Sequence, residues 1–211
     1  MGTTERRERE KERVRGRILD AARELFARDG YDAVTMRKIA EAVEYSPTAI
    51  YLHFKDKESL VRELCIADFD SLARSFQRIA REPDPLERLR KAGLAYADFA
   101  VEHPNHYRLM FMTPHPEGTK DDPSAAGRKG NPEADAYAFL VATVREAIEK
   151  DLLRPDLKDP NLVAQAAWAG VHGVVSLHLA KAHDAWVDWR PLKKTVALVV
   201  DAFTRGVAKE G

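Results

Sequence analysis

Residues 35–60 of the chain read TMRKIAEAVEYSPTAIYLHFKDKESL. Thr35 and Ser46 each precede a short stretch with helical spacing of apolar residues, and their hydroxyl side chains are of the kind that cap a helix N-terminus. The stretch therefore predicts two short helices joined by a tight connection through Glu44 and Tyr45.

The apolar residues of this stretch divide it into a packed side and an outward side. Ile39, Ile50 and Phe54 would hold both helices against a preceding helix, and the small Ala40 would let them cross closely. In a helix-turn-helix of this kind, the second helix enters a DNA major groove with the residues near its N-terminus. The side chains expected to face outward there are Pro47, Thr48, Tyr51 and Leu52.

Helical periodicity continues along the chain, with glycine and proline between the periodic stretches and no convincing alternating segment flanked by hairpin turns. We therefore predict an all-α fold of nine helices. Four pairs of a capping side chain with proline predict helix starts at Ser46-Pro47, Asp84-Pro85, Asn131-Pro132 and Asp159-Pro160. The helices are expected near residues 13–28, 35–43, 46–53, 56–81, 85–101, 104–112, 132–152, 160–181 and 190–208.

Composition predicts a soluble, folded protein, because 45% of the residues are apolar and 32% are charged. No uninterrupted apolar run of membrane-spanning length and no hydrophobic leader core occur in the sequence. The single cysteine, Cys65, cannot form an internal disulfide. We expect a cytoplasmic protein with no membrane partner.

The net charge is zero, so the charge of the whole chain does not indicate a nucleic-acid partner. Its distribution is uneven, because seven basic and only three acidic residues lie between Arg6 and Arg17. One interpretation is a solvated helix start with compensating pairs such as Glu5 with Arg9. The other is a basic arm that lies along DNA phosphates.

The helix-turn-helix stretch resembles the TetR/AcrR family of transcriptional regulators. The similarity rests on three patterns at fixed spacing, Ile39-Ala40, Ile50-Tyr51-x-His53-Phe54 and Lys57-Glu58-x-Leu60, and is strong over about residues 13–65. The resemblance implies a three-helix DNA-binding head joined by the fourth helix to a larger ligand-binding and dimerising body. A double-stranded DNA operator would be its partner.

With this resemblance, the chain is expected to have three parts. Residues 1–12 would form a basic flexible arm and residues 13–58 the helix-turn-helix domain. Residues 59–211 would form the ligand-binding and dimerisation domain. Within it, residues 113–131 are rich in Pro, Gly, Ser, Asp and Lys, which predicts a mobile loop.

The same resemblance assigns roles within the helix-turn-helix. Thr35, Tyr51 and Lys57 would contact backbone phosphates, since hydroxyl and ammonium groups commonly do so. Pro47 and Thr48 would reach base edges, because both can contact a thymine methyl group. The predicted DNA-binding residues are Thr35, Arg37, Pro47, Thr48, Tyr51, Leu52, His53 and Lys57.

Two residues depart from the family pattern, because Glu44 in the turn and Thr48 early in the second helix stand where the family often has glycine. Glu44 is expected to adopt a left-handed conformation at a cost of order 1 kcal/mol or more. Thr48 would change the docking distance, so an operator sequence cannot be transferred from the family.

In the body, Trp168 and His172 are four residues apart and share a helix face. Together with Gly173 they resemble the Trp-x-x-x-His-Gly pattern of one subgroup of TetR-like C-terminal domains. Aromatic and methionine residues at helical spacing would either form plain core or line an apolar cavity for an unknown small-molecule effector. The predicted pocket residues are Tyr96, Phe99, Tyr107, Met110, Phe111, Trp168 and His172.

The last two predicted helices carry broad apolar faces, whereas the terminal helix of a monomer needs only one buried stripe. We therefore predict a homodimer with a two-fold four-helix interface. The predicted interface residues are Leu162, Ala166, Ala169, Gly173, Val196, Val199 and Phe203.

Two other functions are the alternatives to a ligand-released repressor. An enzyme would use His103, His106 or His172 with a nearby carboxylate, but the sequence has no nucleophile elbow, phosphate loop or metal-ligand cluster. We therefore expect no catalytic residue, cofactor or metal. A ligand-independent DNA-binding architectural protein or adaptor stays open as the alternative to a ligand-released repressor.

Overall fold

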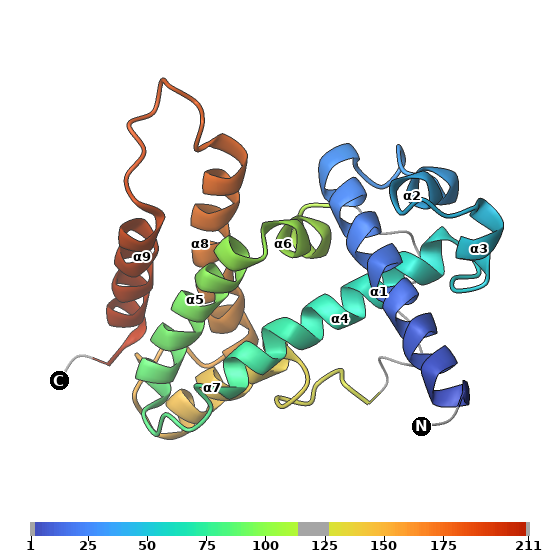
Figure 1. Cartoon of the computed structure of the whole chain (residues 1–211). Helices are drawn as coiled ribbons and strands as arrows, with labels where there is room; N and C mark the ends of the chain where they lie inside the picture. The colour runs from blue at the N-terminus through green and yellow to red at the C-terminus, as the bar shows by residue number, and fades with distance from the viewer. Residues whose placement is uncertain (1–2, 114–126, 210–211) are drawn as a thin grey trace. The chain divides into compact units, whose positions relative to one another are not determined.

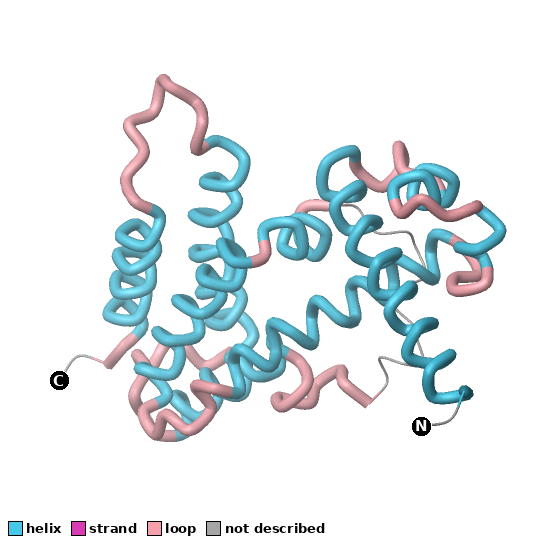
Figure 2. The backbone as a smooth tube through the Cα atoms, in the orientation of Figure 1, coloured by secondary structure: helices cyan, strands magenta, loops and turns pink. Residues whose placement is uncertain are grey.

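The computed structural model describes residues 3–113 and 127–209, with side chains from residue 5 onwards. Within these ranges the chain forms nine α-helices and no named strand, which confirms the all-α prediction (Figure 1, Figure 2). The helices are α1 (Thr3–Asp29), α2 (Met36–Ala42), α3 (Pro47–Tyr51), α4 (Lys57–Gln77), α5 (Pro85–Glu102), α6 (Pro104–Phe111), α7 (Ala136–Glu149), α8 (Pro160–Lys181) and α9 (Leu192–Val207).

The chain divides into two compact units. The described residues of the first are 3–68 and 105–113, and those of the second are 69–104 and 127–209. The predicted boundary after residue 58 therefore lies too early. It also places α6 wrongly, because Leu109 of α6 is buried in the same apolar cluster as the helix-turn-helix.

The core of the first unit is formed by fully buried apolar side chains of α1 to α4, among them Ile18, Ile39, Ile50 and Leu60. Full burial of each such side chain stabilises the fold by roughly 1.5–3 kcal/mol. These contacts hold α2 and α3 against α1 and α4. The predicted packed side of the helix-turn-helix is therefore confirmed.

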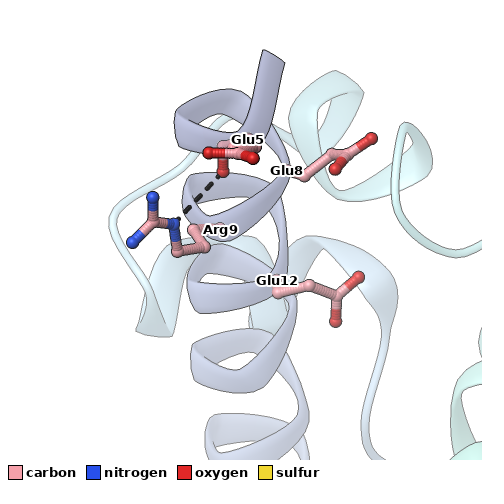
Figure 3. A pocket seen from close by; sticks show the side chains of 4 residues that line it. All are labelled: Glu5, Glu8, Arg9 and Glu12. Carbon is pink, nitrogen blue, oxygen red and sulfur yellow. Dashed lines mark hydrogen bonds between the residues drawn. The ribbon is translucent and has the colours of Figure 1, made fainter. Parts of the chain in front are cut away.

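Residues 3–12 are the first turns of α1 and not a separate flexible arm. On one face of these turns, Glu5, Glu8, Arg9 and Glu12 line an open hollow, in which the Arg9 Nε donates to the Glu5 carbonyl oxygen at 3.3 Å (Figure 3). Three carboxylates on this face would repel phosphates. The geometry favours the solvated helix start over a basic strip on this side of the helix.

The second unit packs α5, α7, α8 and α9 together. Its core includes Leu89, Val144, Val163 and Val207. Gly93 of α5 lies so close to α9 that an added Cβ would stand 2.8 Å from the Val200 Cγ2 atom. A glycine at this position lets the two helices approach closely.

Three of the four predicted pairs of a cap with proline begin helices, since Ser46, Asp84 and Asp159 accept hydrogen bonds from backbone N–H groups of the following turn. Asn131-Pro132 does not. Its backbone closes an isolated turn, and α7 begins at Ala136 with Asp135 as its cap. Asp135 accepts from two backbone N–H groups of α7 and also from Gly130, which fixes the start of the helix beyond the turn.

The predicted mobile loop at 113–131 lies mostly outside the described residues, and its described C-terminal part begins with a turn at residues 127–130. By length and composition alone, α8 is apolar enough to cross a membrane, and 22% of the qualifying window is buried. Polar residues interrupt α8, so no apolar run is continuous, but its average hydropathy still suffices.

Candidate nucleic-acid interface

The short helix α3 presents an apolar side inward and its predicted reading side outward. Ile50 is fully buried, whereas Pro47 and Thr48 are exposed. Tyr51 is 53% exposed and Leu52 is 77% exposed, although both are large side chains that a protein core would normally bury. This exposure leaves all four side chains accessible to a partner.

The turn between α2 and α3 is a Schellman motif with Glu44 in the left-handed region, at φ +60°. The Tyr45 N–H donates to the Ala40 carbonyl at 2.9 Å, and the Glu44 N–H donates to the Glu41 carbonyl at 3.2 Å. The expected left-handed conformation of Glu44 is thus confirmed, and among L-residues this conformation carries a steric cost that glycine avoids.

The N-terminus of α2 holds two further predicted residues. The Thr35 hydroxyl oxygen accepts from the Lys38 backbone N–H at 3.2 Å, which leaves its O–H able to donate to another group. Arg37 is exposed, and its Nε forms an ion pair with Glu41 at 2.9 Å. Surface pairs of this kind contribute little to stability, so a phosphate can compete for the guanidinium group.

Lys57 has a role in the fold of the first unit that the sequence did not indicate. Its Nζ donates to the carbonyl oxygens of Tyr31 and Val34, each at 3.0 Å, and lies 3.9 Å from the centre of the Tyr31 ring. The ammonium group has three N–H donors. Two of them hold the loop before α2, which leaves one for a phosphate.

His53 follows α3 and is half-buried rather than outward. Burial lowers the pKa of its imidazole, and the positive charges of Lys11 and Arg15 lower it further. The ring is therefore mostly uncharged at neutral pH, and its Nδ1 is buried without a hydrogen-bond partner among the residues that the structure describes. His53 lacks the charge and exposure of a phosphate anchor.

Sequence reasoning missed Arg15, which joins three elements of the first unit. Its guanidinium group pairs with Glu63 of α4, donates to the His53 carbonyl at 2.7 Å and lies 4.4 Å from the centre of the Phe54 ring. Arg15 thus fixes the end of the recognition helix on α1 and α4. The sequence showed only a basic residue among several.

A second missed cluster lies deeper in the first unit. Asp68 is 1% exposed and accepts from the Arg23 Nη2 at 2.9 Å and Nε at 3.3 Å. The His106 Nδ1 lies 2.8 Å from the same carboxylate. These side chains connect α1, α4 and α6 within the unit.

Four of the predicted pocket residues, Tyr96, Phe99, Trp168 and His172, belong to the second unit. The Tyr96 hydroxyl lies 3.0 Å from the His172 Nδ1, and the His172 and Trp168 ring centres are 6.2 Å apart. Burial lowers the pKa of His172. The other three predicted pocket residues, Tyr107, Met110 and Phe111, lie on α6 in the first unit.

Another aromatic side chain that sequence reasoning left out of the pocket set is Tyr137. Its ring centre lies 6.2 Å from that of Trp168, and its hydroxyl accepts from the Gln165 Nε2 at 3.1 Å. Tyr137 thus extends the row of aromatic rings formed by Trp168, His172 and Tyr96. Its helical spacing with the other aromatic residues is a signal that the sequence already offers, although the predicted pocket set leaves it out.

The predicted dimer residues of α8 lie on an exposed face, whereas one of those on α9 does not. Leu162, Ala166 and Ala169 are exposed, and a Cβ added to Gly173 would meet nothing within 4 Å. Val196 is only 1% exposed within its own chain, so its place in a dimer interface is corrected.

The outward side of α9 carries Leu198 and Ala202 instead, both exposed. The other two predicted residues are half-buried: Phe203 packs on the core of the second unit, and Val199 lies close to Gly170 of α8. The predicted residues came from the main apolar stripe of α9, and most of that stripe packs within the chain.

Among the described residues, no group of three or more His, Cys, Asp or Glu side chains is placed to hold a metal ion. Cys65 is largely buried, and this burial raises the pKa of its thiol to about 12. Neither feature resembles a catalytic centre.

Comparison with known proteins follows the same division of the chain. Residues 18–64 match the family described as bacterial regulatory proteins, tetR family. Residues 89–203 match the tetracyclin repressor-like C-terminal domain. This match covers more than half of the 211-residue chain.

Two curated relatives are repressors. The chain is 31% identical to the HTH-type transcriptional repressor KstR2 of Mycobacterium tuberculosis over 151 residues, which cover 71% of this chain and 73% of the relative. It is 29% identical to an HTH-type transcriptional repressor of Streptomyces coelicolor over 199 residues, which cover 92% and 98% of the two chains.

Among solved structures, the fold is similar to that of the TetR family regulator PfmR from Thermus thermophilus. The TM-score is 0.68 at 23% identity, with 92% of this chain and 97% of that chain covered. The exposed helix α3, the strained turn before it and the match of both parts of the chain lead to one conclusion. The chain belongs to the TetR family of DNA-binding transcriptional regulators and is not an enzyme.

Proposed function

We propose that the protein is a cytoplasmic repressor that binds a palindromic operator as a homodimer and leaves it when a small molecule binds its second unit. The observation that carries the DNA-binding part is the exposure of Pro47, Thr48, Tyr51 and Leu52 on a helix whose Ile50 is fully buried. Such a helix has a fixed orientation and a free reading side.

On DNA, Thr48 and Pro47 would contact base edges, and Thr48 would both touch a thymine methyl group and exchange a hydrogen bond. The hydroxyls of Thr35 and Tyr51 would donate to phosphates. Arg37 and the remaining N–H of Lys57 would add positive charge. Because His53 is half-buried and mostly uncharged, its proposed contribution is to support α3, with Leu52 making an apolar contact.

The exposed face of α8 and the exposed Leu198 of α9 support the homodimer, because a second copy would cover them. A two-fold axis would then place two α3 helices about 34 Å apart, which matches successive major grooves on one side of DNA. The operator would accordingly be an inverted repeat.

For the effector, the polar contact between Tyr96 and His172 beside Trp168 offers a site where an apolar or aromatic molecule could stack and accept or donate one hydrogen bond. Coupling of roughly 1–3 kcal/mol between ligand and DNA sites would weaken operator binding about 5- to 150-fold. The ligand-independent alternative predicts no such release.

Release of a labelled operator by a set of apolar and aromatic compounds tests the proposal. Tyr96→Phe removes only the hydroxyl that faces His172, and it should bind the operator like the wild type. We expect at least one compound to release the wild type at lower concentration than Tyr96→Phe. If no compound releases the operator from either protein, the proposed apolar or aromatic effector is contradicted, and the result favours the ligand-independent alternative.

A further inference from the structure

One stripe of α1 changes from apolar to basic toward the N-terminus of the helix. Residues three or four positions apart share a helix face, so Arg7, Lys11, Val14 and Ile18 form a single stripe. Ile18 is fully buried in the core of the first unit, and Val14 is half-buried against that core. Lys11 and Arg7 are exposed. The stripe that packs on the helix-turn-helix therefore continues past it as a basic surface.

The two cations of this stripe lack a carboxylate partner. Neither Arg7 nor Lys11 forms an ion pair with any residue that the structure describes. Glu10, three positions from Arg7, is paired with Arg13 at 2.7 Å. The carboxylates of the neighbouring face surround the open hollow instead (Figure 3). Because like charges four positions apart on a helix repel each other, an anionic partner would stabilise this end of α1.

Arg15 fixes the position of this surface relative to α3. Its guanidinium group donates to the His53 carbonyl at 2.7 Å and pairs with Glu63. Lys11 precedes Arg15 by about one helical turn, so it too lies near the end of α3. The pKa of His53 agrees with this placement. Burial lowers that pKa most, the charge of Lys11 is the next largest cause, and Glu12 has a smaller opposite effect.

A further cation of α1 lies at the other end of α3. Arg17 is exposed, and its guanidinium carbon is 5.6 Å from the centre of the Tyr45 ring in the turn before α3. The cations of α1 thus lie beside both ends of the segment that carries the exposed residues of α3, at Tyr45 and at His53. A duplex bound to α3 would bring its backbone toward this positive charge.

Double-stranded DNA is the anionic partner that α3 itself would place beside the basic stripe. A duplex carries one negative charge per about 1.7 Å of its axis, so its charge continues beyond the bases that α3 reads. Arg7 stands roughly 6 Å further along α1 than Lys11, at a rise of about 1.5 Å per residue. This separation exceeds the axial spacing of phosphates, so the two side chains would reach different phosphates.

We propose that Arg7 and Lys11 bind phosphates of the operator outside the base pairs read by α3, so that the N-terminal turns of α1 form a second DNA anchor. The inference rests on the DNA binding proposed above and extends it beyond the helix-turn-helix. Contacts of this kind carry no sequence information, but they add affinity and fix the orientation of the protein on the duplex.

The first test is the salt dependence of binding, measured by fluorescence anisotropy with the full-length protein. Two labelled duplexes serve as probes, one selected from a random library by the wild type and one of unrelated sequence. Arg7→Gln and Lys11→Gln should each lower the slope of log affinity against log salt by about 0.9 per bound chain. Between about 50 and 200 mM salt, each variant should then lose roughly three- to fourfold less affinity than the wild type.

Arg9→Gln is the matched control. It removes the same charge from the same turns, but from the face that carries Glu5, Glu8 and Glu12 (Figure 3). It should change the slope by less than half as much as Lys11→Gln. All three basic side chains are exposed and glutamine is a good helix former, so none of these substitutions should impair folding.

Duplex length separates direct contact from long-range attraction. Trimming the selected duplex to its two half-sites removes the flanking phosphates, so it should weaken binding of the wild type. The double variant Arg7→Gln with Lys11→Gln should lose little on the same trimming. If the wild type and the double variant lose equal affinity, the two cations touch no flanking phosphate and the anchor is wrong.

The inference and the proposed function can fail separately. If an inverted repeat is selected but the slopes of Arg7→Gln and Lys11→Gln match that of Arg9→Gln, the repressor stands and the anchor is refuted. If no repeat is selected but both variants lower the slope on the unrelated duplex, the anchor stands and the operator is contradicted. A wild type that binds neither duplex refutes both.

A membrane is the remaining outcome. If the wild type co-sediments with phosphatidylglycerol vesicles through Arg7 and Lys11, while both variants keep the wild-type slopes on DNA, an anionic lipid surface is the partner of the basic stripe and our inference is wrong.

Discussion

Replacing Glu44 with glycine should stabilise the protein without changing its contacts. Glu44 holds φ at +60° in the turn between α2 and α3, and two backbone hydrogen bonds of the Schellman motif keep it there. The side chain is exposed, so its removal leaves no cavity. The effect therefore isolates the conformational energy of one residue.

The magnitude follows from two opposing terms. An L-residue in the left-handed region costs about 1–2 kcal/mol, which glycine relieves. Glycine in turn loses more backbone entropy on folding, which costs about 0.4–1 kcal/mol. The net gain is about 0.5–1 kcal/mol in the free energy of unfolding, or roughly 1–4 °C in Tm for a chain of this length.

Urea and thermal unfolding of three proteins decide the matter: the wild type, Glu44→Gly and Glu44→Ala. Alanine removes the same carboxylate but keeps the steric strain, so Glu44→Ala should match the wild type within about 0.5 kcal/mol. If Glu44→Ala gains as much as Glu44→Gly, the benefit comes from losing a charge. If Glu44→Gly gains nothing, the strain argument fails.

Other parts of the first unit give further predictions. Asp68→Asn removes the buried carboxylate from Arg23, which keeps only the exposed Asp20 as an ion-pair partner, and should lower the free energy of unfolding by up to about 3–5 kcal/mol in urea titrations; a change below about 1 kcal/mol would contradict the buried pair. Because burial raises the pKa of Cys65 to about 12, its thiol should react with a thiol reagent at about pH 8 only after unfolding, and rapid labelling of the native protein would disprove this. The backbone hydrogen bond from Ser59 holds the pKa of Asp56 below its ordinary value. The ionised carboxylate therefore stabilises the fold at pH values above its ordinary pKa, and this stabilisation is lost as the pH falls through the pKa of the folded state. Asp56→Asn should flatten the acid side of the plot of stability against pH, and an unchanged plot would refute the cap. Lys57→Ala should both destabilise the protein and lower the salt slope of DNA binding by about one, whereas loss of stability with an unaltered slope would restrict Lys57 to its contacts with two carbonyl oxygens.

Local features of the fold could be predicted because their causes lie close together in the sequence. The caps Thr35 and Ser46 each act on the residue three positions further along, and the left-handed conformation of Glu44 follows from the length of the turn. The outward position of Tyr51 and Leu52 follows from helical spacing relative to the buried Ile50.

Features that depend on distant residues could not be predicted in this way. Arg15 meets Glu63, and Arg23 meets Asp68, each more than forty positions away, and nothing in the local pattern selects these partners. The predicted start of α7 was wrong for a different reason. Both Asn131 and Asp135 can cap a helix, and only the folded turn between them decides which one does.

The residues that face a second copy were likewise only partly predictable from the local sequence. On α9 the residues predicted to face a second copy were taken from the main apolar stripe, and that stripe packs within the second unit, so Val196 is buried while Leu198, outside the stripe, is exposed. On α8 the spacing of small residues was informative, and three of the predicted positions there are exposed.

The most direct test of the central claim is selection of bound duplexes from a random double-stranded library by the purified wild-type protein. We expect enrichment of an inverted repeat whose half-sites lie about one helical turn, roughly 34 Å, apart. Thr48→Ala should enrich a repeat altered at one position of each half-site. If no inverted repeat is enriched, or if Thr48→Ala selects the same sequence as the wild type, the assignment of α3 as the reading helix of a dimer is contradicted.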